Sequence, residues 1–465
     1  MENKTKIHFH CNLKSGEDNI KENCCVDLIF ERYNLSKIEL RLYTDNNAKT
    51  TSMLNKMLIE EDIANYIEVL SIDGRYQNID FKGSKITTML TKTDLNYISL
   101  GLSQVKYEWI RYEGDEKIDT TNHAFFLSKA ARKLSPVIST KFDARGKWED
   151  ATKRNTVESD YYSFSFTNEF FQTSTIKEDN DVLSLSLTPI LDLYVKGQVE
   201  DETIFQQANS ICLLASFYLS DNIDFYKAII NKEQTQVILI KSIELEAKSQ
   251  EKYSFTTDFR TFEAFFNSIQ NLDQISLNYI WWKRNIEKII ISNNLDGESK
   301  FLILYNILEQ TLSYLRKAGQ ISNTANSEYF KGISSNLKKI KSLCQELVAE
   351  IKSFIPIENE NDREEYQKQN GKIEFYKNII TNKSSLRSSN KIQLILDKLD
   401  IDSKACGIDS VKELVSLRDD IIHSNREITF EELDVVNINL FKMSNLVLLK
   451  LLNPKNELSR FLKRK

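Results

Sequence analysis

The first 200 residues alternate apolar and polar positions in short runs, a pattern typical of half-buried β-strands. The runs are rich in β-branched and aromatic residues and are bounded by Asn, Asp, Gly and Ser. The clearest runs cover residues 26–30, 37–43, 161–166 and 182–187. Helical spacing interrupts the strands near residues 51–65 and 122–134. The pattern predicts a mainly β, sandwich-like domain of antiparallel strands over residues 1–200.

The hydrophobic period changes near residue 200. From Thr203 to Ile229 apolar residues recur at the spacing of one helix face. A further strand is expected at residues 236–240, and helices are expected at 258–270 and 273–292. We therefore expect residues 201–298 to form a mostly helical connecting region.

Helical periodicity dominates residues 299–465. We predict helices over residues 301–316, 331–354, 371–382, 390–399, 408–424 and 430–452. Thr429 and Glu432 have the spacing of a capping box at the start of the last helix. Residues 356–370 are too polar to enter a core and are expected to form a loop or a frayed helix. The predicted fold class is α+β, a mainly β N-terminal domain followed by an all-α bundle.

Composition supports a soluble globular chain with long regular elements. The sequence has 465 residues, enough for two or three domains, and 41% of them are hydrophobic. It contains only 12 Gly and 4 Pro. The net charge is -5, but residues 301–465 carry 26 basic against 22 acidic side chains, while residues 1–300 carry 36 against 45. The C-terminal region is therefore the better candidate to meet nucleic acid.

Targeting and covalent cross-linking signals are weak. The N-terminal residues lack a long apolar core, and no stretch approaches the roughly 18 uninterrupted apolar residues of a membrane span. The expectation is a cytoplasmic protein. Six cysteines are sparse and irregularly spaced, so we expect free thiols in a reducing compartment. The sequence contains no Walker loop, zinc-finger spacing, nucleophile elbow or internal repeat.

A cationic residue stands on the apolar face of the helix predicted at residues 408–424. On an ideal helix, five apolar residues lie within roughly 60° of Arg418: Val411, Leu414, Val415, Ile421 and Ile422. Removing a guanidinium from water is costly unless a partner or a bound anion compensates for the lost hydration. Arg418 is therefore expected to meet a carboxylate or an anionic ligand.

His423 lies five positions after Arg418, about 140° around the same helix. Asp419 lies one turn before His423 and is expected to orient or charge its imidazole. Because Arg418 and His423 cannot both point at one spot from a single regular helix, two copies of the helix across a symmetry axis would bring them together more easily. The spacing therefore favours a dimeric site.

The segment Arg418-Asp-Asp-Ile-Ile-His423 resembles the Arg-x4-6-His signature of the HEPN ribonucleases. Asp419 matches the polar residue that often follows the arginine, and the segment ends one predicted helix and precedes another. The resemblance implies a HEPN-like bundle over residues 299–465 and a metal-independent endoribonuclease. It also implies a homodimer formed through this bundle, with the two motifs facing each other over the RNA backbone.

The helix predicted at residues 301–316 is strongly apolar and carries Glu309 on or near its buried side. Glu309 therefore needs a partner, and Arg418 is a candidate. A mostly β region, then a helix with a central glutamate, then the Arg-x4-His helix looks like the layout of the ApeA-type abortive-infection proteins of bacteria. That likeness implies RNA cleavage in growth arrest or antiphage defence, and a β domain that senses a phage-derived or cellular trigger.

The chemistry of RNA cleavage fits these residue types. RNA carries an internal nucleophile in its 2′-hydroxyl, so cleavage needs a proton carrier near neutral pH and a positive group for the charge on phosphate. His423 fits the role of general acid and base, and Arg418 can grip phosphate oxygens with two hydrogen bonds. No metal or cofactor is required.

Three other interpretations stay open. Arg418 can pair with a buried carboxylate while His423 caps a helix end, where a cationic imidazole suits the dipole. The bundle can also be a non-catalytic module that binds RNA or protein, with the β domain as a sensor. Finally, the chain can be a toxin that a partner antitoxin silences.

Three further groups of residues are candidate sites. His8 and His10 alternate on a predicted strand, with Cys11 opposite and Cys24 and Cys25 nearby, but the spacing matches no standard metal site, and a plain strand with exposed imidazoles is preferred. Trp281 and Trp282, followed by Lys283 and Arg284, can stack RNA bases, although core packing is preferred. Asp73, Asp80 and Lys82 resemble a restriction-type nuclease triad only loosely, and solvated surface groups are preferred.

Overall fold

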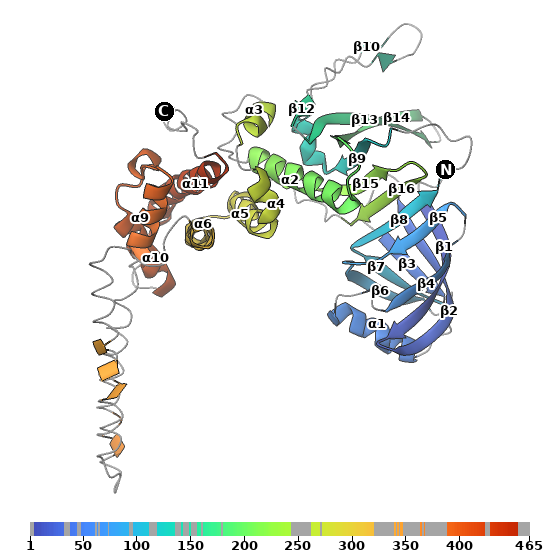
Figure 1. The fold of residues 1–465 in the computed structure, drawn as a ribbon, viewed down its shortest axis with the longest axis horizontal. Helices are drawn as coiled ribbons and strands as arrows, with labels where there is room; N and C mark the ends of the chain where they lie inside the picture. Colours follow the sequence, from blue (N-terminus) through green and yellow to red (C-terminus); the bar gives the residue numbers. More distant parts are fainter. Residues whose placement is uncertain are drawn as a thin grey trace. The chain divides into compact units, whose positions relative to one another are not determined.

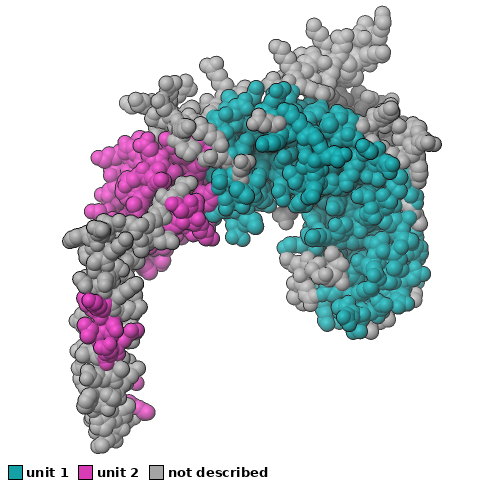
Figure 2. Space-filling model, in the orientation of Figure 1, with its two compact units in different colours: residues 1–290 teal, residues 291–465 magenta. Residues whose placement is uncertain are grey.

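The structure is a computed structural model that describes most of the chain. The described residues are 4–31, 38–43, 48–60, 63, 66–72, 74–92, 96–110, 119–134, 141–142, 148–149, 156–159, 161–177, 180–242, 262–269, 272–319, 339–340, 342–343, 345–346, 363–364, 367, 388–423 and 428–453. The chain divides into two compact units, Met1–Ile290 and Ile291–Lys465, which Figure 2 shows in different colours.

The first unit contains a six-stranded sheet in the order β4-β1-β2-β3-β7-β6, and every neighbouring pair is antiparallel (Figure 1). Its strands are β1 (Lys4–Ser15), β2 (Asp18–Glu31), β3 (Ile38–Tyr43), β4 (Ile67–Ile72), β6 (Ile86–Lys92) and β7 (Tyr97–Leu102). Side chains on β3 alternate between buried and half-buried, as the sequence pattern predicts. The helix α1 (Ala48–Glu60) follows β3, close to the predicted helical interruption.

A second, eight-stranded sheet has the order β12-β13-β14-β9-β15-β16-β8-β5. Its strands are β5 (Tyr76–Asp80), β8 (Gln104–Ile110), β9 (Asn122–Leu127), β12 (Thr156–Glu158), β13 (Tyr162–Lys177), β14 (Asn180–Val195), β15 (Phe225–Asn231) and β16 (Thr235–Lys241). The short strands β10 (Lys141–Phe142) and β11 (Trp148–Glu149) pair only with each other among the described residues. This sheet continues past residue 200, because β15 pairs with β9 and β16 pairs with β8.

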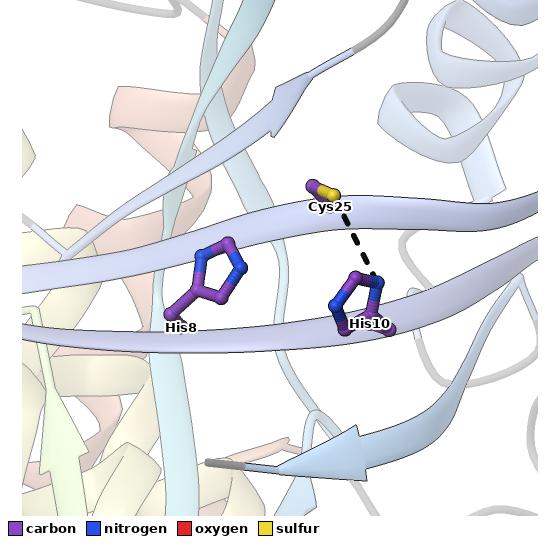
Figure 3. Close-up of side chains that lie close together, drawn as sticks. All are labelled: His8, His10 and Cys25. Atoms are coloured by element: carbon purple, nitrogen blue, oxygen red, sulfur yellow. Dashed lines mark hydrogen bonds between the residues drawn. The ribbon is translucent and has the colours of Figure 1, made fainter.

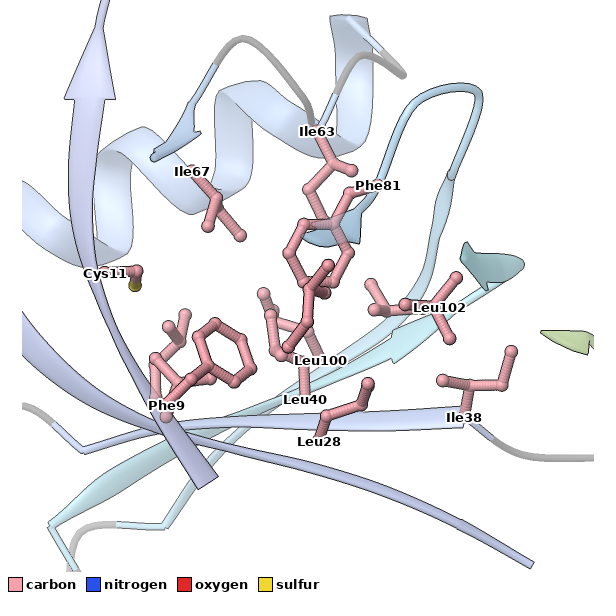
Figure 4. Packing of buried hydrophobic residues seen from close by; sticks show 14 of the residues in the cluster. Phe9, Cys11, Leu28, Ile38, Leu40, Ile63, Ile67, Phe81, Leu100 and Leu102 are labelled. Atoms are coloured by element: carbon pink, nitrogen blue, oxygen red, sulfur yellow. The ribbon is translucent and has the colours of Figure 1, made fainter. Parts of the chain in front are cut away.

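One core cluster joins the two sheets of the first unit. Figure 4 shows Phe9, Leu28, Leu40 and Leu100 of the six-stranded sheet packed together in this cluster. Residues of the second sheet, such as Val105 and Ile240, belong to the same buried cluster. The burial of these apolar side chains is the main contribution to the stability of the first unit.

Helices follow or connect strands of the second sheet along the chain. They are the 3-10 helix η3 (Lys129–Leu134), α2 (Asp201–Leu219), α3 (Phe262–Asn267), α4 (Leu272–Leu277) and α5 (Tyr279–Ser292). Phe205 of α2 packs against Phe125 and Phe225 of the sheet. α2 is buried along much of its length, which explains why the sequence shows a broad apolar face there.

Two of the predicted helices were too long. The helix expected from Thr203 to Ile229 ends at Leu219, because Ser220 adopts a left-handed conformation with φ 50°, and residues 225–229 belong to β15 instead. The helix expected near residues 122–134 is a strand up to Leu127, where β9 pairs with β14 on one side and β15 on the other. Pairing within a sheet overrides the local pattern at both places.

The second unit is helical throughout its described part. Its helices are α6 (Gly297–Lys317), α9 (Ser388–Lys398), the 3-10 helix η5 (Lys404–Cys406), α10 (Val411–His423) and α11 (Phe430–Leu452). The side chain of Thr429 accepts a hydrogen bond from the backbone N–H of Glu432, so the predicted cap of α11 is confirmed. Predicted helices at 331–354 and 371–382 lie almost wholly outside the described residues.

Polar contacts fix α11 against α6. The Asn437 amide donates to the carbonyl oxygen of Gly297 at 2.9 Å, and the Ser444 hydroxyl donates to that of Leu304 at 3.3 Å.

By length and composition α11 could cross a membrane, but 72% of its most apolar window is buried inside the structure. The fold is thus mixed α and β, with the strands N-terminal and helices C-terminal, as predicted.

Candidate functional site

Arg418 projects from α10, whose buried positions recur at helical spacing. Val411, Leu414, Leu417 and Ile421 are buried, and Arg418 follows Leu417 on the edge of this buried face. The Arg418 side chain keeps 29% of its surface exposed, so it is shielded from solvent without being enclosed. The sequence-based placement in the middle of the apolar face was too deep, because Ile422 is 46% exposed.

Two carboxylates hold the guanidinium of Arg418. Its Nη1 donates to Oδ1 of Asp419 at 2.9 Å, and its Nη2 lies 3.6 Å from Oε1 of Glu309 on α6. The pairing of Glu309 with Arg418 is confirmed. The guanidinium carbon also lies 5.8 Å from the centre of the Tyr305 ring, one turn before Glu309 on α6.

Charges at this site shift the pKa values of two groups. The hydrogen bond to Asp419 raises the pKa of Arg418, against the opposing effect of burial, and Glu309 acts in the same direction. Burial raises the pKa of Tyr305 to about 12, with a further contribution from Glu309. Tyr305 is buried, and among the described residues its hydroxyl has no hydrogen-bond partner. Sequence reasoning missed Tyr305, because its role depends on α6 packing next to α10.

A pocket of about 150 Å³ opens beside this group. Its lining residues come from α6 and α9 and are Tyr305, Leu308, Glu309, Leu312, Ser388, Lys391, Ile392 and Ile395. Lys391 supplies a second positive charge at the wall of the pocket. The pocket therefore places Lys391 and Glu309, the partner of Arg418, at the wall of a small, mostly apolar hollow.

His423 is the last residue of α10, and its side chain is exposed. Asp419 contacts Arg418, and within the described part of the chain no hydrogen bond joins Asp419 to His423. The contact that the structure shows for Asp419 is thus with the guanidinium, which offers a permanent charge and a short hydrogen bond.

Large apolar side chains are exposed close to this end of α10 in the sequence. Ile422 on α10, and Phe430, Val435 and Ile438 on α11, each expose between 46% and 62% of their surface. Exposed large apolar residues can contribute to protein contact surfaces when they form a continuous patch. The second unit therefore offers apolar surface on the same two helices that flank His423.

The tryptophan pair and Asp80 have structural roles. Trp282 is 1% exposed and packs edge-on against the Trp281 ring at 5.0 Å, so the preference for core packing is confirmed for Trp282. Asp80 accepts a hydrogen bond from the backbone N–H of Lys82 in the turn after β5, which is a local turn contact. Asp73 lies outside the described residues.

A second hollow lies in the first unit. It has a volume of about 620 Å³ and is lined by residues of β4 and β5 in the first unit, among them Leu70, Tyr76 and Asp80. Its lining lacks the combination of cationic and titratable groups seen around Arg418. Size alone therefore does not make it the catalytic candidate.

Comparisons with family models, with curated proteins and with solved structures found no match to this chain.

Proposed function

We propose that the second unit is a HEPN-type, metal-independent endoribonuclease in which Arg418 and His423 act on one phosphodiester. The observation that supports this proposal most is the position of Arg418. Its guanidinium is shielded on one side by the Tyr305 ring and remains 29% exposed, while the exposed imidazole of His423 ends the same helix.

The two side chains supply complementary chemistry. His423 takes the proton from the 2′-hydroxyl as general base and returns a proton to the leaving 5′-oxygen as general acid. Arg418 donates hydrogen bonds to the phosphate oxygens, on which negative charge grows in the transition state. The expected products are fragments with a 2′,3′-cyclic phosphate at one end and a 5′-hydroxyl at the other.

The carboxylates beside Arg418 are compatible with this role. A guanidinium has five N–H donors, and only one of them makes a short hydrogen bond to Asp419. Glu309 and Asp419 are themselves 44% and 47% exposed, so losing their contact with Arg418 costs little. In this proposal the carboxylates hold Arg418 in place until a phosphate replaces one of them.

A homodimer would bring two such sites together. One α10 helix presents Arg418 and His423 about 140° apart, so a second copy is needed to place both around one phosphate. The exposed Ile422, Phe430, Val435 and Ile438 supply apolar surface for that contact. We propose that the dimer forms through this part of the second unit.

The biological role follows the same proposal. The activity would cleave RNA in the cytoplasm during growth arrest or antiphage defence, and the first unit would sense a phage-derived or cellular trigger. Its hollow of about 620 Å³ between β4 and β5 is large enough for a small ligand. The alternative to control by the first unit is a partner antitoxin that keeps the nuclease inactive.

The test is RNA cleavage by the purified full-length protein in the presence of a chelator. Wild-type protein should release fragments that end in cyclic phosphate, and His423→Ala should stop the cleavage. Lys412→Ala is the matched control, because it removes an exposed cation from the same helix. Unchanged cutting by His423→Ala would dispose of the catalytic assignment.

The second candidate is a non-catalytic module that binds RNA or protein. The pairing of Arg418 with Asp419 and Glu309 favours it, because carboxylates offset the charge that catalysis needs. An intact dimer that binds RNA without cutting it would support this candidate over the nuclease.

A further inference from the structure

Strand register in the first unit brings together four side chains that the sequence separates. β1 and β2 form an antiparallel ladder in which His8 pairs with Asp27 and His10 pairs with Cys25. Side chains two apart on a strand share a face, so these four residues stand on one side of the sheet. The residues between them, Phe9 and Val26, point into the core instead.

Three of these side chains carry metal-binding atoms at short separation. Figure 3 shows His8 and His10 rising from β1 and Cys25 from the neighbouring strand. One ligand atom from each of the three lies within 4.8 Å of the others, and Nδ1 of His10 lies 3.8 Å from Sγ of Cys25. The two imidazole rings meet edge to face with centroids 5.6 Å apart. Cys25 is a free thiol.

Asp27 orients the first imidazole. Its Oδ1 lies 2.9 Å from Nδ1 of His8, which fixes the Nδ1–H tautomer and leaves Nε2 with its lone pair free. Asp27 is 1% exposed and also accepts hydrogen bonds or ionic contacts from Lys6 and Tyr43. A buried carboxylate behind a histidine is the arrangement that raises ligand basicity in metal sites.

We propose that His8, His10 and Cys25 bind a borderline transition-metal ion of the zinc class, with Asp27 as the positioning residue. Two imidazoles and one thiolate are the donors such ions prefer, and three protein ligands leave a fourth position for water or an exogenous ligand. Binding replaces the thiol proton of Cys25 with the ion and releases that proton to solvent. The inference is independent of the proposed nuclease.

Coordination requires only side-chain rotation. Bonds of about 2.0–2.1 Å to nitrogen and about 2.3 Å to sulfur place neighbouring ligands of a tetrahedral site roughly 3.3–3.6 Å apart. The separation of His10 from Cys25 is already close to this value. His8, His10 and Cys25 are each partly exposed, so their side chains can close around an ion without moving the ladder.

The register also explains why the sequence favoured a plain strand. Three cysteines lie near the histidines in the sequence, but Cys11 and Cys24 are at most 2% exposed and face the core. Only the pairing of His10 with Cys25 shows which thiol shares the face of the imidazoles. A one-residue slip would have placed a different cysteine there.

Cobalt provides a direct test, because Co²⁺ replaces Zn²⁺ in such sites and absorbs light. Reduced, metal-free, full-length protein is titrated with Co²⁺ alone. One equivalent per chain should bind, with a thiolate-to-cobalt charge-transfer band in the near ultraviolet and visible bands of four-coordinate cobalt. Added Zn²⁺ should bleach both.

Variants of adjacent residues identify the ligands. Cys25→Ser should abolish the charge-transfer band, whereas the matched control Cys24→Ala, one position away on the opposite face, should keep it. Asp27→Asn should weaken Co²⁺ binding by roughly 10- to 100-fold while the band positions stay the same, as expected for a positioning residue. Far-ultraviolet circular dichroism checks that each variant is folded.

The proposal is overturned if wild-type protein shows no stoichiometric charge-transfer band, or if the band survives Cys25→Ser. It is also overturned if Cys24→Ala loses the band as fully as Cys25→Ser does. Should Cys25→Ser fail to fold, His10→Ala carries the same test: the proposal expects at least a tenfold loss of affinity, and unchanged binding contradicts it.

Discussion

The group around Arg418 and the group around Asp27 are both ion-pair clusters, but the chain builds them differently. Arg418, Asp419 and His423 come from two turns of one helix, and only Glu309 and Tyr305 come from another element. The cluster around Asp27 comes from two paired strands, with Tyr43 added from a third. The first is therefore visible in the spacing of one short segment, whereas the second exists only through strand register.

The two clusters also differ in how firmly their charges are held. Asp27 is 1% exposed and has three partners, Lys6, His8 and Tyr43. Glu309 and Asp419 are nearly half exposed and share one guanidinium. A buried carboxylate with several partners is fixed, while an exposed ion pair exchanges with water or another anion at little cost. We infer that the cluster around Asp27 is a rigid platform and that the cluster around Arg418 can release its cation to a ligand.

The largest predicted effect concerns catalysis at the exchangeable cluster. Arg418→Ala removes the donor to the phosphate oxygens, so RNA cleavage should slow by roughly 10²- to 10³-fold. Single-turnover cleavage of a labelled RNA measures this, with Lys412→Ala as the control. Equal rates for Arg418→Ala and Lys412→Ala would mean that position 418 has no special role.

The next largest effect concerns the cluster around Asp27 and the stability of the first unit. Asp27→Asn weakens charge-assisted hydrogen bonds to three partners and should lower the free energy of unfolding of the first unit by about 1.5–3 kcal/mol. All four tryptophans, Trp109, Trp148, Trp281 and Trp282, belong to residues 1–290, so tryptophan fluorescence in urea reports this unit alone. Tyr43→Phe, which removes one of the three partners, should cost less. A change within error for Asp27→Asn would show that the cluster is not a stabilising platform.

A buried imidazole, that of His123, gives the first unit a stability that depends on pH. Burial lowers the pKa of His123 below 6.5, and its Nδ1 accepts a hydrogen bond from the backbone N–H of Asn231 at 3.3 Å. As pH falls through 6.5 the unfolded chain takes up a proton that the folded chain refuses, so stability decreases.

Tryptophan-detected urea midpoints at pH 7 and pH 5 measure this effect. The midpoint should fall on acidification, and His123→Asn, which cannot titrate, should reduce the fall. An equal pH dependence in wild type and His123→Asn would assign the effect to other groups.

The smallest predicted effect concerns the stability of the second unit. Arg418→Ala should change the stability of the second unit by only about 0–1 kcal/mol, because the ion pairs it breaks are partly exposed. Urea unfolding followed by far-ultraviolet circular dichroism measures the helical unit, and the tryptophan transition should not move. A loss above this range would show that Arg418 serves the fold more than a substrate.

The parts of the structure that sequence could predict are those set by local spacing. The cap at Thr429, the burial of Leu414 and Ile421, and the pairing of Glu309 with Arg418 all follow from positions three or four apart, or from a charge on an apolar face. The sequence predicts a helix over residues 225–229, although these residues belong to β15. Their apolar positions fit both the helical period and the strand period.

The remaining features depend on contacts between distant segments. The Tyr305 ring beneath the guanidinium and the choice of Cys25 over Cys24 each require tertiary packing or strand register. No pattern within one segment specifies them, because the competing arrangements satisfy the same local spacing.

The most direct test of the proposed nuclease is chemical rescue of His423→Ala. Cleavage of RNA by this variant is measured in a chelator with and without added imidazole, at several pH values. If His423 transfers the proton, cleavage should fall by at least about 100-fold and recover in part with imidazole, with a pH profile that follows the added base. Cleavage that is unaffected by the substitution would contradict the account.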